Sequence, residues 1–364
     1  MKVAIVHEFL IQSGGAEQVL DVLCQLYPDA DIYTLVYDAN RFGNRFPANR
    51  VRTSFIQQLP FGQRYYQAYL PMMPSAIERF DFGGYDLVVS SSSSFAKGVI
   101  TGPATLHVCY CHTPTRYLWG ETDTYMESLR YPTFIKRLAL RYFPTLRMWD
   151  QLAAARPDIF IANSEEVAGR IQKYYRRTAE VVYPPVRVEE FPLQTTAGGY
   201  FLTGGRLVGY KRFDIVVAAC TRLRLPLIVF GEGPDESRLR SMAGGTVKFV
   251  GHVSRSKLMA LYASAQAFIH PQIEDFGITV VEAMAAGVPV VAYAKGGALE
   301  TVVSGKTGLF FEDQDWESLA AILIRFSPAV FSSAVIRQHA EKFDTRRFIE
   351  NFQVAVRTAK GETV

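Results

Sequence analysis

Residues 270–297 read HPQIEDFGITVVEAMAAGVPVVAYAKGG, and this stretch says most about the fold. Phe276 and Gly277 are typical of the start of a helix, and Gly287 and Pro289 end that helix before a buried apolar strand, VPVVAYA. The apolar face of the helix is formed by Val280, Val281 and Met284. The stretch therefore predicts a loop, a helix and a strand in succession. The unpaired N–H groups at the helix N-terminus, at Gly277 and Ile278, would suit a phosphate.

Two glutamates, Glu274 and Glu282, stand eight positions apart in this stretch. Glu274 falls in the loop before the helix and Glu282 falls within the helix. Two glutamates at this spacing are by themselves more often solvated surface carboxylates than a site. Here they flank the predicted phosphate position, where each could hold hydroxyls of a sugar nucleotide.

Strands and helices alternate along the chain in two series. The first series occupies residues 1–190, and the segment 179–200 then interrupts it with Pro184-Pro185 and Gly198-Gly199, which indicates an interdomain connection. A second series occupies residues 198–342. This alternation predicts an α/β protein with two doubly wound parallel sheets, one in each domain.

Four glycine-bearing loops precede predicted helices, and ligands of doubly wound sheets bind in such loops at the carboxyl ends of the strands. The loops contain Gly14-Gly15, Gly231-x-Gly233, Gly277 and Gly296-Gly297. Arg206 follows a predicted strand and Lys211 begins the next helix, so both cations can face the same cleft. Two fixed cations would stabilise a diphosphate as it leaves. Alone, each glycine pair is only a tight turn and each cation only a surface charge.

The motifs together resemble those of retaining nucleotide-sugar glycosyltransferases of the GT-B fold, family 4. The two glutamates resemble that family's E-x7-E signature. Five further segments follow the family's order: IVHEFLIQSGGAEQVL, CYCHTPTRYLW, YPPV, GGRLVGYKR and VFGEGP. The resemblance runs from about residue 2 to about residue 360. Within the family, the chain is most similar to mannosyltransferases of O-antigen and capsule assembly.

The resemblance implies two Rossmann-like domains that face a central cleft, with a C-terminal helix, residues 343–364, packed on the first domain. It implies that Arg206 and Lys211 clamp the diphosphate, that Glu274 orients hydroxyls of the transferred sugar, and that Glu282 holds the ribose. The resemblance also implies that His112 donates to a hydroxyl of the reacting sugar and that Gly15 lies by the phosphates. The amides of Phe276, Gly277 and Ile278 are expected to bind the distal phosphate, and Val253 is expected to contact the base.

The function implied is transfer of a hexose, mannose from GDP-mannose, to a hydroxyl of a lipid-linked saccharide in cell-surface polysaccharide synthesis. The expected enzyme retains anomeric configuration and needs neither metal nor cofactor. Asp29-x-Asp31 and Asp313-x-Asp315 resemble metal-binding pairs, but they are interpreted as turns.

Several alternatives stay open. Family members often carry an acidic residue where this chain has Arg255, so the base is not fixed, and GDP-rhamnose or a UDP-hexose is the alternative donor. A non-catalytic nucleotide-binding protein is a further alternative. A nucleotide-binding oxidoreductase is disfavoured because no GxGxxG motif follows the first strand.

Composition points to where the protein works. The 364 residues are 49% hydrophobic, without a run long enough to span a membrane and without a recognisable signal peptide at the start. The four cysteines are far apart or in apolar segments, which favours a reducing compartment. We therefore expect a cytoplasmic protein.

The net charge of +4 is unevenly distributed. Residues 39–77 contain five arginines and no acid, and residues 128–149 contain five more cations and no acid. Both stretches are rich in aromatic residues, a combination that suits an anionic membrane surface. No nucleic-acid-binding module appears. We expect peripheral binding to the inner face of the plasma membrane, with an ordinary arginine-rich surface as the alternative.

Overall fold

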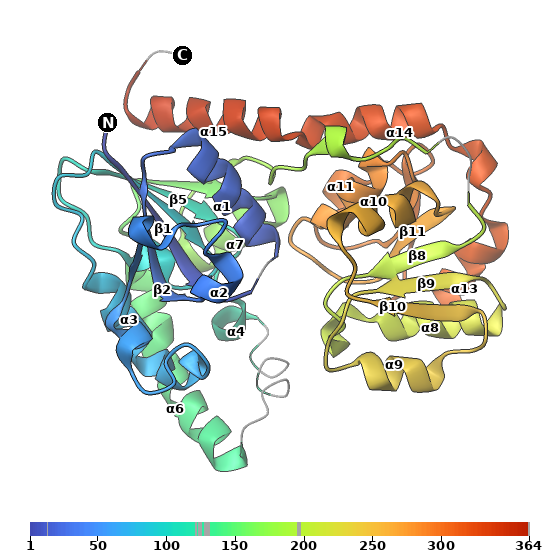
Figure 1. Ribbon diagram of the computed structural model, residues 1–364, viewed down its shortest axis with the longest axis horizontal. Coiled ribbons are helices and arrows are strands. Elements are labelled where there is room, and N and C mark those ends of the chain that lie inside the picture. Colours follow the sequence, from blue (N-terminus) through green and yellow to red (C-terminus); the bar gives the residue numbers. More distant parts are fainter. Residues whose placement is uncertain (13, 121, 123–125, 127–131, 195–197, 363–364) are drawn as a thin grey trace. The chain divides into compact units, whose positions relative to one another are not determined.

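The computed structural model describes residues 1–12, 14–120, 122, 126, 132–194 and 198–362. The chain divides into two compact units (Figure 1). Met1–Tyr183 and Phe348–Val364 form the first unit, and Pro184–Arg347 forms the second.

The first unit is built on a seven-stranded sheet with the strand order β3-β2-β1-β4-β5-β6-β7. Every neighbouring pair is parallel. The strands are β1 (Val3–Leu10), β2 (Asp31–Tyr37), β3 (Val51–Thr53), β4 (Leu87–Ser92), β5 (Leu106–Cys111), β6 (Ile159–Ala162) and β7 (Glu180–Val181). The order reverses between β1 and β4, and in sheets of this type ligands bind at the carboxyl ends of the strands beside such a reversal.

Alternate residues of these strands enter two separate cores, because successive side chains point to opposite faces of a sheet. Val3 and Ile5 pack with α1 and α15 on one face, whereas Ala4 and Val6 pack with α3 and α6 on the other (Figure 1). The helices that the described residues of this unit form include α1 (Gly15–Leu26), α2 (Ala39–Phe42), α3 (Met73–Glu78), α4 (Arg116–Trp119), α6 (Thr133–Ala153), α7 (Glu165–Tyr175) and most of α15 (Thr345–Ala359). The sheet is therefore covered on both faces, which explains why β1, β2, β4, β5 and β6 are buried at nearly every position.

The second unit repeats this plan with a six-stranded parallel sheet in the order β10-β9-β8-β11-β12-β13. The strands are β8 (Phe201–Gly204), β9 (Leu227–Phe230), β10 (Val247–Gly251), β11 (Ala267–His270), β12 (Val290–Tyr293) and β13 (Gly308–Phe311). The helices are α8 (Phe213–Arg222), α9 (Glu236–Met242), α10 (Arg255–Ala263), α11 (Ile278–Ala285), α12 (Ala298–Thr301), α13 (Trp316–Arg325) and α14 (Ser333–Ala340). Here the order reverses between β8 and β11.

Short 3-10 helices occur in several of the connections. They are η1 (Ala48–Arg50), η2 (Phe55–Gln58), η3 (Tyr66–Met72), η4 (Ala96–Gly98), η5 (Val188–Glu190), η6 (Gly209–Lys211), η7 (Pro328–Val330) and η8 (Glu341–Phe343). Two of them, η4 and η6, lie in loops that leave the carboxyl ends of β4 and β8.

The structure confirms the fold class predicted from the sequence, two doubly wound α/β sheets. The predicted helix appears as α11, and the strand that follows appears as β12. Gly277 precedes α11 in a left-handed conformation, φ 86°, which glycine adopts without steric strain. Within the described part of the chain, no helix combines the length and apolar character that crossing a membrane requires.

Candidate active site

The carboxyl ends of β8 and β11 bring together the residues that sequence analysis placed around a diphosphate. Arg206 follows β8, and Glu274 lies in the loop between β11 and α11. Lys211 ends η6, and its ammonium is 2.7 Å from the carboxylate of Glu274. A Cβ atom on Gly205 would lie 3.7 Å from the Lys211 Nζ, so this ammonium lies over the backbone next to Arg206. The loops after the two strands that flank the reversal in strand order therefore meet at one charged cluster.

Arg206 is exposed, and its guanidinium donates to the Tyr210 hydroxyl at 3.0 Å. Phe276 is buried, and its ring lies against Phe343 with the ring centroids 5.4 Å apart. Ile278 is the first residue of α11, so the N–H groups of the first turn begin directly beyond Gly277. Such N–H groups lack partners within the helix and suit an anion.

Glu282 is buried on α11, and Arg255 supplies its countercharge. A guanidinium nitrogen of Arg255 is 2.5 Å from Glu282 Oε1, and the Tyr262 hydroxyl is 3.5 Å from Oε2. The same guanidinium is 3.2 Å from Glu190 and lies over the ring of Phe191. Burial raises the pKa of Glu282, and the attraction of Arg255 opposes that rise. Arg255, noted in the sequence only as a departure from the family, is thus the main partner of the predicted ribose-binding carboxylate.

His270 is a residue of this region to which sequence analysis gave no role. It is fully buried at the end of β11, and no partner among the described residues bonds either ring nitrogen. Gln272 Oε1 and Thr279 Oγ1 are likewise buried without partners within the described residues. A Cβ atom on Gly277 would lie 3.5 Å from His270 Nε2. Burial lowers the pKa of His270 to about 4. Unpaired buried polar atoms are uncommon and ask for an explanation, of which a bound ligand is one.

The loop after β9 packs closely against the loop after β8 and also bonds the loop after β10. A Cβ atom on Gly231 would lie only 1.9 Å from the carbonyl oxygen of Gly205, so glycine is required there. The Glu232 carboxylate accepts from the His252 N–H at 3.2 Å. Val253, the predicted base contact, lies in the following loop and is half-buried. The backbone between β10 and α10 is thereby fixed beside the loop after β9.

The first unit carries His112 directly after β5. Its Nε2 is 2.8 Å from the Ser91 hydroxyl, and that hydroxyl is 3.0 Å from His7 Nδ1. His7 Nε2 is in turn 3.4 Å from the carboxylate of Glu17 in the first turn of α1. Gly15 is the first residue of the same helix. The predicted histidine and the predicted glycine loop are therefore linked through polar side chains from β1 and β4.

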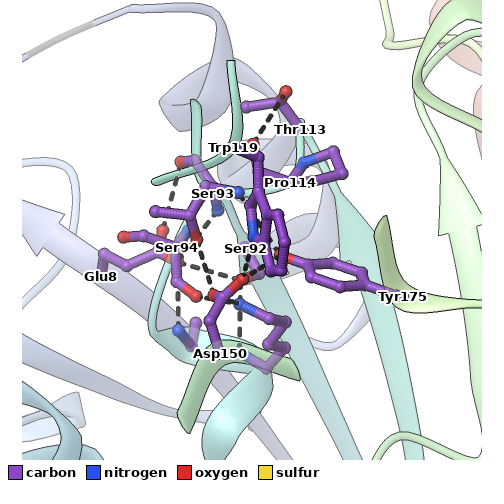
Figure 2. Close-up of polar contacts among 12 residues, drawn as sticks. Glu8, Ser92, Ser93, Ser94, Thr113, Pro114, Trp119, Asp150 and Tyr175 are labelled. Carbon is purple, nitrogen blue, oxygen red and sulfur yellow. Dashed lines mark hydrogen bonds and ion pairs between the residues drawn. The ribbon is translucent and has the colours of Figure 1, made fainter. Parts of the chain in front are cut away.

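Two buried carboxylates, Glu8 and Asp150, hold the loops that follow β4 and β5 (Figure 2). Glu8 accepts bonds from the backbone N–H groups of Ser93, Ser94 and Ala96 at 2.9–3.0 Å, which fixes the loop after β4. Asp150 lies on α6 and fixes the loop after β5. Its partners are Lys97 at 2.5 Å, the Thr115 hydroxyl at 2.7 Å, the Trp119 indole N–H at 2.7 Å and the Tyr175 hydroxyl at 2.9 Å.

Sequence analysis missed Glu8, Lys97 and Asp150. An acid within the apolar strand VAIVHEFL was a signal that could have marked Glu8, since a buried carboxylate needs partners. Nothing local marks Asp150, because its partners come from three separate segments. No group of three or more His, Cys, Asp or Glu side chains that could hold a metal ion occurs in the described part of the chain.

Two protein-family profiles match the chain. The profile described as "Glycosyltransferase Family 4" matches residues 13–190, and the profile described as "Glycosyl transferases group 1" matches residues 189–329. The chain belongs to glycosyltransferase family 4. This confirms the family expected from the motifs.

Two curated relatives of this family 4 protein carry informative names. One is a GDP-mannose-dependent alpha-mannosyltransferase of Mycolicibacterium smegmatis, 32% identical over 46% of this chain and 48% of the relative. The other is a GDP-mannose-dependent alpha-(1-6)-phosphatidylinositol monomannoside mannosyltransferase of Mycobacterium tuberculosis, 36% identical over 36% of this chain and 40% of the relative. The match thus spans less than half the length of each of these relatives.

Solved structures share the fold over nearly the whole chain. Sucrose-phosphate synthase from Thermosynechococcus elongatus superposes with a TM-score of 0.74 at 16% identity, over 99% of this chain and 100% of that chain. Anabaena HepE in complex with UDP superposes with a TM-score of 0.72 at 17% identity, over 98% and 100%. These similarities establish the GT-B fold for the family 4 chain.

Proposed function

We propose that this family 4 protein is a retaining, metal-independent hexosyltransferase that moves mannose from GDP-mannose onto a hydroxyl of a lipid-linked saccharide. The observation that carries the proposal is the charged cluster in the second unit, where the Lys211 ammonium is 2.7 Å from Glu274 beside Arg206 and the N-terminus of α11. Fixed cations, a sugar-binding carboxylate and free amides are the groups that a nucleotide-sugar diphosphate needs. The names of the two mannosyltransferase relatives support GDP-mannose as the donor.

In the proposed reaction, the bond between the anomeric carbon and the diphosphate oxygen breaks as the acceptor oxygen bonds the same carbon from the same face. The leaving phosphate oxygen takes the proton of the acceptor hydroxyl. Negative charge grows on that oxygen, and Arg206, Lys211 and the α11 amides stabilise it where it forms. Glu274 orients hydroxyls of the sugar, Glu282 holds the ribose, and His112 bonds a sugar hydroxyl.

A lipid-linked acceptor requires the enzyme to approach a membrane, and one surface of the first unit supports this. Exposed apolar side chains gather on η3, α6 and the loop before η3, and they include Phe61, Tyr65, Met72 and Leu140. The Tyr142 hydroxyl on α6 bonds the Pro71 carbonyl oxygen at 3.3 Å, so α6 adjoins η3. Arg64 lies over the Tyr65 ring, and α6 carries Lys136, Arg137 and Arg141. Basic and apolar side chains on one surface suit anionic lipid.

Part of the basic charge in the two stretches is already used within the protein. Arg45 forms an ion pair with Asp21, and Arg52 forms one with Asp31 at 3.3 Å. Arg130 lies outside the described residues. On α6, Lys136, Arg137 and Arg141 have no ion-pair partner among the described residues and remain for a membrane, whereas the Arg147 guanidinium donates to the Leu118 carbonyl oxygen.

Donor binding tests the proposal most directly. GDP-mannose or GDP should raise the melting temperature more than UDP, UDP-glucose or NAD. Ligand at about a hundred times its dissociation constant should stabilise the protein by ~2.7 kcal/mol. A larger rise in melting temperature with UDP-glucose would indicate a different donor and leave the enzyme class unchanged. A rise with NAD alone would overturn the proposal.

Metal independence is tested separately in the transfer assay. Activity should persist in EDTA, because two side-chain cations and helix amides would neutralise the diphosphate. Complete loss in EDTA, restored by Mn²⁺ or Mg²⁺, would refute this part of the proposal and leave the donor assignment intact.

A further inference from the structure

A line of hydrogen bonds runs through the first unit from Glu17 to His112. We call these four side chains, Glu17, His7, Ser91 and His112, the relay. The distances are 3.4 Å from Glu17 Oε1 to His7 Nε2, 3.0 Å from His7 Nδ1 to Ser91 Oγ, and 2.8 Å from Ser91 Oγ to His112 Nε2. Glu17, His7 and Ser91 are buried, and His112 is partly exposed.

The sheet itself aligns the relay. His7 of β1 and Ser91 of β4 are direct partners in register, and Ser91 pairs with Tyr110 of β5. His112 follows Tyr110 by two residues, so all three polar side chains belong to the same face of the sheet. That face carries α1, which supplies Glu17. Two of the three strands, β1 and β4, flank the reversal in strand order.

With Glu17 ionised and His7 carrying a single proton, the direction of every bond in the relay follows from the chemistry of the groups. An ionised carboxylate can only accept, so His7 Nε2 must carry the proton it gives to Glu17. With one proton on its ring, His7 then has a lone pair at Nδ1, which accepts the Ser91 hydroxyl proton. The Ser91 oxygen is left to accept a bond, and the donor is His112 Nε2–H. The proton of neutral His112 is thereby held at Nε2, and its Nδ1 carries a lone pair.

We infer that Glu17, His7 and Ser91 are positioning residues that hold His112 in the Nε2–H tautomer, so that Nδ1 accepts a hydrogen bond from a sugar hydroxyl. This inference rests on the proposed transferase function and reverses the direction that the family resemblance implied for His112. Within the described residues, no protein group bonds the Nδ1 atom. It is therefore the nitrogen that remains for a substrate.

The surroundings of His112 favour the neutral ring that this assignment requires. His7 of β1 and Ser91 of β4 lie on the same face of the sheet as His112, Glu8 points to the opposite face, and the Tyr110 ring meets the His112 ring edge-on at 5.2 Å. Burial lowers the pKa of His112 to about 4, a positive charge on His7 would lower it further, and the Glu8 carboxylate opposes the shift. The Asn163 amide bonds the His112 carbonyl oxygen at 2.9 Å, which fixes the backbone.

The tautomer can be read directly by ¹⁵N NMR of protein labelled at its six histidines. We expect the His112 Nδ1 signal at the position of a nitrogen without a proton and the Nε2 signal at that of a protonated nitrogen. The Nδ1–H tautomer in the wild-type protein, or a protonated ring at neutral pH, would overturn the inference. His112→Gln assigns the signals.

Ser91→Ala removes the bridge, and the His112 signals should then move towards a mixture of the two tautomers. The turnover number should fall roughly tenfold or more, the range for a misplaced proton-transfer or hydrogen-bonding group, while the donor KM changes little. Ser91→Thr keeps the hydroxyl and should restore both.

Glu17→Gln is the second variant. Its amide can donate to His7, so it removes the fixed direction and should also give mixed tautomers.

Ser90→Ala is the matched control. Ser90 is the preceding residue of β4, points to the opposite face, and makes the same kind of bond, 2.8 Å to His107 Nε2. This variant should leave the His112 signals unchanged. Unchanged His112 signals in both Ser91→Ala and Glu17→Gln would overturn the inference.

The NMR spectra are recorded without donor or acceptor. They therefore test the relay even if the protein proves not to transfer sugar, a result that would refute only the proposed function.

Discussion

The guanidinium of Arg255 lies 2.5 Å from the carboxylate of Glu282, which is 4% exposed. Arg255 begins α10, and Glu282 lies on the neighbouring helix α11. A buried carboxylate is expensive to ionise unless a cation compensates it. The pair thus keeps a carboxylate charged at the position where the family resemblance expects the donor ribose. Arg255, which stands where family members often carry an acidic residue, is therefore paired with Glu282 within the proposed site.

Removal of that cation should make the free energy of unfolding depend on pH. Arg255 lowers the pKa of Glu282, so in Arg255→Ala burial raises that pKa further. The folded protein then binds a proton at Glu282 at a pH where the unfolded chain has already released it. Stability should then fall as pH rises through the folded pKa. We expect a loss of about 2–3 kcal/mol at neutral pH and less near about pH 5, measured by urea denaturation.

The double variant Arg255→Ala/Glu282→Gln serves as the control for this pH effect. It lacks the titrating group, so its difference from the wild type should vary little with pH. An equal loss for Arg255→Ala at both pH values would show that Arg255 stabilises by packing on Phe191 alone.

The diphosphate clamp and the ribose carboxylate should separate kinetically. Arg206→Ala or Lys211→Ala should each lower kcat by about a hundredfold, because one donor that strengthens in the transition state contributes ~3 kcal/mol. Glu282→Ala should mainly raise the donor KM, since ribose binding is the same in the ground and transition states. Steady-state assays with GDP-mannose measure both.

Arg238→Ala provides the reference for these kinetic variants. Its guanidinium forms an exposed ion pair with Asp235 at 2.6 Å in the same unit. It should leave both constants near those of the wild type. If Arg206→Ala and Lys211→Ala behave like this control, the diphosphate does not bind at the charged cluster.

The buried carboxylate of Asp150 should be among the most sensitive positions for stability. Asp150→Asn places an NH₂ group against donors and leaves the ammonium of Lys97, which is 1% exposed, without its anion. Breaking a buried pair from one side typically costs about 3–5 kcal/mol. We expect that loss in denaturant unfolding.

Glu236→Gln makes the same chemical change in an exposed ion pair with Arg240 on α9. Pairs of this kind contribute only about 0.3–0.5 kcal/mol. A comparable loss in both variants would mean that the Asp150 network is accessible to water.

Membrane binding should depend on the cations of α6. The triple variant Lys136→Glu, Arg137→Glu and Arg141→Glu should no longer sediment with anionic vesicles, because each cation near the surface adds about 1 kcal/mol. Transfer to a short water-soluble acceptor should continue. Sedimentation of the wild-type protein should weaken as salt rises.

A second triple variant, Lys248→Glu, Lys306→Glu and Lys342→Glu, carries the same change in net charge on exposed residues of the second unit. It should still bind the vesicles. If neither triple variant differs from the wild type, or the wild type does not sediment at low salt, the basic stretches of the first unit are ordinary solvated surface.

The sequence by itself determined the two α/β series, because apolar periodicity and glycine or proline at the ends of elements are local signals. It placed α11 between Gly277 and Gly287, and it marked Arg206, Lys211, Glu274 and Glu282 by their spacing. Even the two faces of the first sheet follow from it. Val3 and Ile5 alternate with Ala4 and Val6 in the two cores, as a period of two requires.

Only the tertiary structure decided which polar groups meet. Glu17, His7, Ser91 and His112 are spread over most of the first unit's sequence, and their bonds depend on the register of β1, β4 and β5. Asp150 likewise collects partners from three segments, and Arg255 on α10 reaches Glu282 on α11. Local propensity carries no information on such pairings, since a hydrogen bond is set by the distance between atoms and not by their separation along the chain.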